Sequence, residues 1–224
     1  MNFILEIITV FFTFSFVVIS EKIFKKEGLY VWIGIATITA NILVCKNVDI
    51  LGFTTNVGVV MFASNFLATD IMSEKYGSKE SKKAIILGVF AQMIFIILTM
   101  MALAFTPSST DLCHESMKTL FSINIRVSTV SIILYLISNL LDIYLFEKIK
   151  KKFPNKLWLR NNVATIISNC LENYFFIFFA FVGIYDIQTI FSIATVGSII
   201  EAVVALLDTP FLYIAKAEFK KRDI

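Results

Sequence analysis

Long apolar segments recur along the chain, separated by short polar connections. They lie near residues 2–20, 29–46, 51–72, 84–106, 123–147, 159–183 and 190–215. A helix needs about 20 mostly apolar residues to cross a bilayer, and it satisfies its own backbone hydrogen bonds there. The pattern predicts an all-α integral membrane protein, a bundle of six to seven transmembrane helices, with residues 1–224 forming one polytopic membrane domain.

The third segment differs from the others because it is unusually polar. It contains Thr54, Thr55, Asn56, Ser64 and Asn65. If only six helices cross the membrane, this is the segment that we expect to be re-entrant or interfacial. The side of the membrane on which the N-terminus lies depends on that count, because seven crossings place it outside.

Lysines are concentrated in alternate connections. The first, third and fifth connections and the C-terminal tail hold most of them: Lys22, Lys25, Lys26, Lys75, Lys79, Lys82, Lys83, Lys148, Lys150, Lys151, Lys152, Lys156, Lys216, Lys220 and Lys221. The other connections hold only Lys46 and Lys118, with Arg126 at the edge of a segment. Because cytoplasmic loops carry an excess of positive charge, the pattern predicts a cytoplasmic C-terminus.

Composition agrees with a membrane location. The chain is 58% hydrophobic and 17% charged, against about 25% charged residues in soluble domains. The first segment contains Glu6 and lacks a basic start and a cleavage site, so we expect a retained helix. Cys45, Cys113 and Cys170 are odd in number and widely spaced, which predicts neither a disulfide framework nor a zinc site. The predicted location is the inner (plasma) membrane, with several crossings.

Several acidic residues lie inside the apolar segments, away from their last residues. They are Glu6, Asp70, Asp142, Glu172, Glu201 and Asp208. A charge at the centre of a bilayer costs on the order of 3 kcal/mol on insertion scales, and such residues usually face the interior of the bundle at a functional site. We therefore expect the helices to surround a polar site.

Two of these acids belong to a repeated motif. Residues 138–146 read SNLLDIYLF and residues 168–176 read SNCLENYFF, and a weaker copy begins at Ser64 and Asn65 and includes Asp70. Adjacent spans are antiparallel, so the two strong copies are expected to meet near the midplane from opposite directions. Internal repeats around a midplane site are typical of transporters.

Each copy offers a carboxylate, a carboxamide, a hydroxyl and aromatic rings. A carboxylate accepts two parallel N–H donors, an amide offers a donor and an acceptor, and the rings provide flat faces for stacking. This combination suits a planar, nitrogen-rich heterocycle with a guanine-like edge, and a cationic amine on the ligand would also suit an acidic cavity. The pattern indicates a class of ligand and leaves its identity open.

Three motifs resemble a known family. Residues 70–77 (DIMSEKYG), residues 157–160 (LWLR) with the Thr165, Ser168, Asn169 and Glu172 that follow, and the Ser138, Asn139 and Asp142 set resemble the signatures of the YhhQ family of queuosine precursor transporters, also called the VUT family. The similarity runs from about Gly58 to Tyr213. The chain has Asn139 and Asn169 where the family is expected to have Gln, Glu172 where it has Asp, and Ala164 where it has Ser.

The resemblance implies uptake of queuine or a related 7-deazaguanine base into the cytoplasm for the salvage of a tRNA modification. The implied substrate-binding residues are Asn65, Asp70, Ser138, Asn139, Asp142, Tyr144, Phe146, Arg160, Ser168, Asn169, Glu172 and Phe176. Glu74 and Trp158 are expected at a gate or cytoplasmic mouth. We expect no cofactor, no metal, no nucleic-acid partner and no enzymatic activity. The partners are the base and membrane lipid, and the composition is compatible with a homodimer.

Two other classes stay open. The chain could be the substrate-binding subunit of a vitamin importer that needs ATPase partners, or an intramembrane enzyme that uses Asp142, Glu172 and Asp208 as acids. The sequence lacks a Walker A motif and the HExxH and GxSxG patterns. Proton coupling and facilitated diffusion are equally consistent with it. The residues from Asp111 to Glu115 include the only histidine, His114, and are expected to be a solvated loop and not a metal site.

Overall fold

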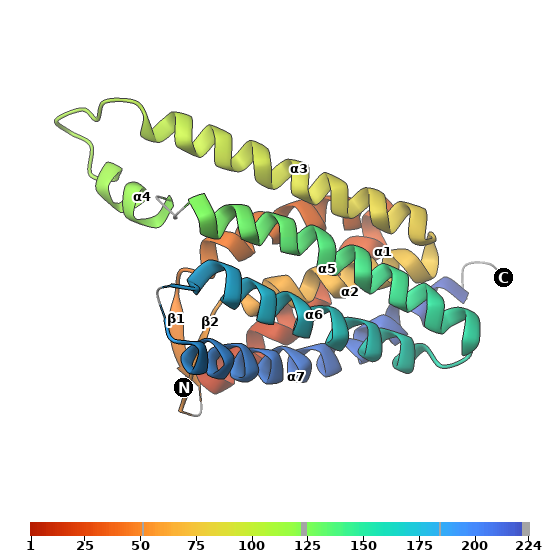
Figure 1. Cartoon of the computed structure of the whole chain (residues 1–224). Helices are drawn as coiled ribbons and strands as arrows, with labels where there is room; N and C mark the ends of the chain where they lie inside the picture. Colours follow the sequence, from red (N-terminus) through yellow and green to blue (C-terminus); the bar gives the residue numbers. More distant parts are fainter. Residues whose placement is uncertain (51, 122–124, 184, 221–224) are drawn as a thin grey trace.

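The apolar segments form long helices. The computed structural model describes residues 1–50, 52–121, 125–183 and 185–220 of the chain. Its elements are α1 (Asn2–Leu43), β1 (Asn47–Ile50), β2 (Phe53–Asn56), α2 (Val59–Lys75), α3 (Ser78–Leu103), α4 (His114–Phe121), α5 (Ile125–Lys152), α6 (Leu157–Phe181) and α7 (Ile187–Lys220) (Figure 1). The predicted helical membrane bundle is confirmed, with one small β-hairpin added.

The first two predicted segments form one bent helix. Helix α1 is interrupted at Lys25, whose φ of 58° and ψ of −140° are not helical. The two arms pack closely beside the bend, where a Cβ on Gly28 would lie 2.3 Å from the carbonyl oxygen of Ser20. Near the start of α1, Asn2 donates a hydrogen bond to the carbonyl of Asp49, so both ends of α1 lie close to the hairpin. The two arms therefore run in opposite directions, as two crossings would.

The third predicted segment is only partly helical, which corrects its expected start at residue 51. Strands β1 and β2 pair antiparallel with Ile50 opposite Phe53, and Gly52 occupies the turn with a φ of 86°. A tight hairpin turn of this kind favours glycine at positive φ. Helix α2 then has 17 residues, a length of about 25 Å at 1.5 Å per residue, at the short end of what a crossing needs.

The bundle has two distinct ends. We call the end that contains the bend of α1, the α2–α3 turn, the α5–α6 connection and the last turns of α7 the lysine-rich end. The opposite end, with the N-terminus, the hairpin, α4 and the α6–α7 connection, is the hairpin end (Figure 1). The arms of α1 and the helices α2, α3, α5, α6 and α7 run between these ends in alternating directions, so the lysine-bearing connections share one end.

Helix α2 occupies the centre of the bundle. Every residue from 63 to 73 is buried, and α2 packs against α1, α3, α5 and α7. Among the described residues, four helical stretches are long and apolar enough to cross a membrane, at Asn2–Leu43, Ser78–Leu103, Val130–Lys152 and Ile187–Ala217. Helix α2, with 17 residues, and helix α6 are not among these stretches. The polar third segment is thus the interior helix, surrounded by more apolar ones.

The connection around Asp111 contains a helix that the sequence did not predict. One oxygen of Asp111 accepts hydrogen bonds from the backbone N–H groups of Cys113 and His114, and α4 begins at His114. These residues are solvent-exposed, apart from a half-buried His114. Within the described residues, no group of three metal-ligating side chains is present. Asp186 similarly begins α7, where hydrogen bonds from the side chain and backbone of Thr189 lower the pKa of its carboxyl.

Candidate functional site

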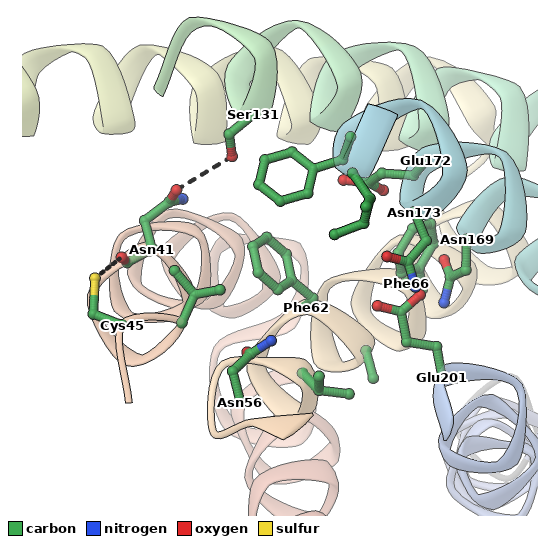
Figure 2. A pocket seen from close by; sticks show the side chains of 15 residues that line it. Asn41, Cys45, Asn56, Phe62, Phe66, Ser131, Asn169, Glu172, Asn173 and Glu201 are labelled. Carbon is green, nitrogen blue, oxygen red and sulfur yellow. Dashed lines mark hydrogen bonds between the residues drawn. The ribbon is translucent and has the colours of Figure 1, made fainter. Parts of the chain in front are cut away.

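A cavity of about 200 Å³ lies near the hairpin end of the bundle. Five helices, α1, α2, α5, α6 and α7, and strand β2 contribute side chains to it (Figure 2). The lining residues are Asn41, Val44, Cys45, Asn56, Val59, Phe62, Ala63, Phe66, Ser131, Asn169, Glu172, Asn173, Phe176, Ile177 and Glu201. Cys45 is exposed, so the cavity reaches the surface on this side.

One wall of the cavity is acidic and rich in amides. Asn169, Glu172 and Asn173 from α6 gather with Glu201 from α7 (Figure 2). Glu172 accepts a hydrogen bond from the hydroxyl of Ser138 on α5, and its charge is close enough to act on that of Glu201. The Oδ1 atom of Asn169 is buried and has no hydrogen-bond partner among the described residues. This wall therefore presents mainly hydrogen-bond acceptors.

The rest of the cavity is largely apolar and aromatic. Phe62 and Phe66 from α2 and Phe176 from α6 supply rings, and Phe66 is only 3% exposed. At the edge, Ser131 donates a hydrogen bond of 3.4 Å to Asn41. Flat rings opposite a polar wall suit a planar ligand with a polar edge.

The two repeated motifs meet, as predicted, but their acids lie at different depths. Helices α5 and α6 are antiparallel, with Ser138 bonded to Glu172 and Thr165 donating to Asp142 over 3.1 Å. This pairing puts Asn139 and Asn169 at nearly the same level. Each acid lies three residues farther along, in opposite directions, which separates them by about 9 Å along the helix axes.

Three buried aspartates form a second group, closer to the lysine-rich end. We call Asp70, Asp142 and Asp208 the aspartate cluster. All three are fully buried and interact electrostatically with one another. Asn161 donates to Asp208 over 2.5 Å, whereas Asp70 lies within hydrogen-bonding reach only of Asp142, another carboxyl group, among the described residues.

A network of ion pairs closes the lysine-rich end. The carboxylate of Glu74 on α2 contacts Arg160 at 2.5 Å, Lys216 at 2.7 Å and Lys150 at 3.2 Å. We call these four residues the Glu74 cluster. Arg160 is 1% exposed, and its other terminal nitrogen donates to the carbonyl of Pro154 over 2.7 Å. The cluster joins α2, α5, α6 and α7.

The structure distributes the predicted site residues over several places. Asn169, Glu172 and Phe176 line the cavity, and Ser138 borders it through Glu172. The others lie outside its lining: Asn65, Asp70, Asn139, Asp142, Tyr144, Phe146, Arg160 and Ser168.

The predicted residues outside the lining have other neighbours. Asn65 donates to the hydroxyl of Thr37, and Asn139 donates to the backbone of its own helix. Phe146 lies beneath the guanidinium group of Arg160, at 5.3 Å from its ring centroid. Buried Ser168 has no partner for its hydroxyl among the described residues. These residues surround the cavity or the two charged clusters without reaching the cavity surface.

Two predicted residues point outwards. Tyr144 is 57% exposed, with the ammonium group of Lys148 over its ring. Its position follows from helical geometry, because residues two apart lie on nearly opposite faces and Asp142 faces inwards. Trp158, expected at the mouth, is 50% exposed at the start of α6, on the lysine-rich end.

Several cavity residues were not predicted as site residues. Glu201 was recognised as a membrane acid, but it stands outside the repeated motifs. Asn56 lies in the unpredicted hairpin, and Asn173 directly follows Glu172. Asn173 packs closely against α7, where a Cβ on Gly197 would lie 2.6 Å from its Nδ2 atom. The small residue in α7 is the sequence signal that could have indicated this close contact.

Gly197→Ala should weaken ligand binding by displacing the side chain of Asn173. The added methyl group requires the amide to move, and one net hydrogen bond is worth about 0.5–1.5 kcal/mol, or roughly a 2- to 13-fold loss of affinity. Gly34→Ala is the control, because its Cβ would lie 3.8 Å from that of Ala91, an ordinary contact. Equal affinities for both variants, measured by binding to the purified protein, would contradict this account of Asn173.

Comparison with known proteins agrees with the resemblance. The family described as putative vitamin uptake transporter matches residues 56–215. A probable queuosine precursor transporter of Bacillus subtilis (strain 168) is 36% identical over 205 residues, which cover 91% of this chain and 90% of that protein. The queuosine precursor transporter of Escherichia coli (strain K12) is 28% identical over 143 residues, 64% of this chain and 62% of that protein. No solved structure matches the chain.

The matched region includes the features described above. Residues 56–215 contain most of the cavity lining, the whole aspartate cluster and all of the Glu74 cluster except Lys216. The match covers more than half of the chain, and the Bacillus subtilis protein aligns over most of both lengths. This chain therefore belongs to the YhhQ, or VUT, family of multi-pass membrane transporters.

Proposed function

We propose that this chain imports a 7-deazaguanine base, queuine or a related queuosine precursor, into the cytoplasm. The observation that carries the proposal is the cavity, in which carboxylates and carboxamides face aromatic rings within about 200 Å³. The names of the two relatives support the same class of substrate. We place the protein in the plasma membrane, which is the inner membrane of a cell that has two.

The base binds with its hydrogen-bonding edge towards α6. The carboxylate of Glu172 accepts two N–H donors from a guanine-like edge, as carboxylates do for paired donors. The free Oδ1 of Asn169 accepts a further one, and Phe66 and Phe176 pack on the ring faces. Hydrogen bonds to a charged group are worth about 1.5–3 kcal/mol each, so Glu172 contributes a large share of the affinity.

The two ends of the bundle play different roles during import. We assign the lysine-rich end to the cytoplasm by the positive-inside rule, so that the cavity is reached from outside through the hairpin end. The Glu74 cluster closes the cytoplasmic end beneath it. Release of the base inside then requires the helices joined by Glu74 to separate, as in alternating access.

Transport by the purified chain in liposomes tests the proposal. Wild-type protein should take up labelled queuine and release it chemically unchanged, and Glu172→Gln should reduce the apparent affinity roughly 10- to 150-fold. Glu115→Gln is the matched control, because Glu115 is exposed on α4 and does not line the cavity.

The same experiment separates the alternative functions. Uptake that appears only after ATPase partners are added would identify the chain as a subunit of a larger importer. Recovery of a different compound from the vesicles would identify an enzyme. Wild-type protein that transports no 7-deazaguanine under any of these conditions would refute the proposal.

A further inference from the structure

We infer that Glu201 binds a positively charged amine on the ligand, so that the cavity selects 7-deazaguanines with a cationic side chain over uncharged ones. This inference rests on the proposed function and adds a residue that determines specificity. Glu201 projects from α7 into the cavity and lies beside Asn169 and Asn173 of α6, in the same acidic wall as Glu172 (Figure 2). A substituent of a ligand held by Glu172 can therefore reach Glu201.

The cavity contains two acids, and no basic residue is among its described lining residues. Two acids at the lysine-rich end, Glu74 and Glu21, differ in this respect. Glu74 is surrounded by three cations, and Glu21 pairs with Lys75 at 2.6 Å. Within the described part of the chain, no hydrogen bond or ion pair satisfies Glu201. A ligand that brings a positive charge supplies the compensation that the protein supplies elsewhere.

The hydrogen-bonding character of the wall points the same way. Besides the two carboxylates, the Oδ1 atom of Asn169 is buried and has no partner among the described residues, and the same is true of Asn56 elsewhere in the cavity lining. Asn169 is only 6% exposed. A wall with this excess of acceptors requires a ligand with an excess of donors. A guanine-like N–H edge provides some of them, and an ammonium group provides three more.

The two carboxylates are suited to different parts of such a ligand. Glu172 is held by the hydroxyl of Ser138, next to Asn169, which fixes it for recognition of a rigid edge. Glu201 comes from another helix, α7, and has no such restraint among the described residues. The rings of Phe62 and Phe66 favour a planar organic cation over a hydrated metal ion, which would need more oxygen ligands than this wall offers.

The test measures the binding of two bases to the purified protein. The first is 7-deazaguanine with an aminomethyl group on C7, which is protonated at neutral pH, and the second is unsubstituted 7-deazaguanine. Wild-type protein should prefer the first. Glu201→Gln should weaken binding of the aminomethyl base roughly 10- to 150-fold and that of the unsubstituted base far less. Glu172→Gln should weaken both. Glu6→Gln, an acid outside this cavity, should change neither.

Each other outcome overturns a defined part of the argument. If Glu201→Gln weakens both bases equally, or if wild-type protein does not distinguish them, the specificity role is wrong while the proposed function stands. Binding that depends on sodium in the wild type and loses this dependence in Glu201→Gln would assign the residue to a metal ion instead. If the wild type binds neither base, the proposed function fails. Retained binding of the unsubstituted base by Glu201→Gln also shows that this variant is folded.

Discussion

Glu74→Gln should destabilise the protein by about 3–5 kcal/mol, the usual cost of removing one partner from a buried ion pair. Arg160 is 1% exposed, and Glu74 is the only carboxylate within ion-pair distance of it among the described residues. Lys150 and Lys216, each with 32% of the side chain exposed, can turn towards water when the carboxylate is lost. The guanidinium group of Arg160 cannot, so its charge stays buried without compensation.

Thermal unfolding of the purified protein in detergent measures this effect, and Glu80→Gln is its control. Glu80 also lies at the lysine-rich end, but its contact with Lys26 is 3.8 Å long and partly exposed, and such pairs contribute little. The amide of the variant can still accept the hydrogen bond that Tyr30 donates to Glu80. The double variant Glu74→Gln, Arg160→Met removes both charges and should regain much of the lost stability. If the stability lost in the double variant equals the sum of the losses in the two single variants, the uncompensated charge of Arg160 is not what destabilises Glu74→Gln.

The helices were predictable because length and composition determine a membrane span. The lysines at positions 22, 25 and 26 separated the two arms of α1 correctly, although the chain stays helical through most of this region. The hairpin was not predictable in the same way. Ile50, Leu51 and Phe53 continue the apolar run of the third segment, and only Gly52 indicates a turn. Strands of four residues are too short to show a period of their own.

The candidate site was predictable to the extent that one helix determines it. The repeat identified Asn169 and Glu172, which line the cavity. The depth of each acid depends on how α5 and α6 pair, and this pairing places Asp142 with Thr165 and away from Glu172. The position of Glu201 depends on the packing of α7 against α6, which joins residues far apart in sequence. Tertiary contacts of this kind leave no local pattern.

Asp70→Asn should raise the stability of the protein and abolish uptake driven by a pH gradient. Asp70 is fully buried beside Asp142 and Asp208, and among the described residues only the carboxyl group of Asp142 lies within hydrogen-bonding reach of it. An amide of the same shape removes one acid from this group, and we expect a gain of about 0.5–2 kcal/mol, as for other stabilising substitutions at functionally constrained positions. Thermal unfolding measures this gain in stability. Glu6→Gln, which changes an acid outside the aspartate cluster, is the control.

The transport arm of this experiment separates substrate binding from energy coupling. Asp70 does not line the cavity, so exchange of labelled for unlabelled base across vesicles without a gradient should continue in Asp70→Asn. Accumulation against a concentration difference should be lost, because buried carboxylates in transporters act as proton carriers and an amide cannot take up and release a proton. If Asp70→Asn also loses exchange, then Asp70 takes part in substrate binding, as the sequence predicted. Wild-type uptake that ignores a collapsed pH gradient would show that import is facilitated diffusion, and the aspartate cluster would then have no part in driving it.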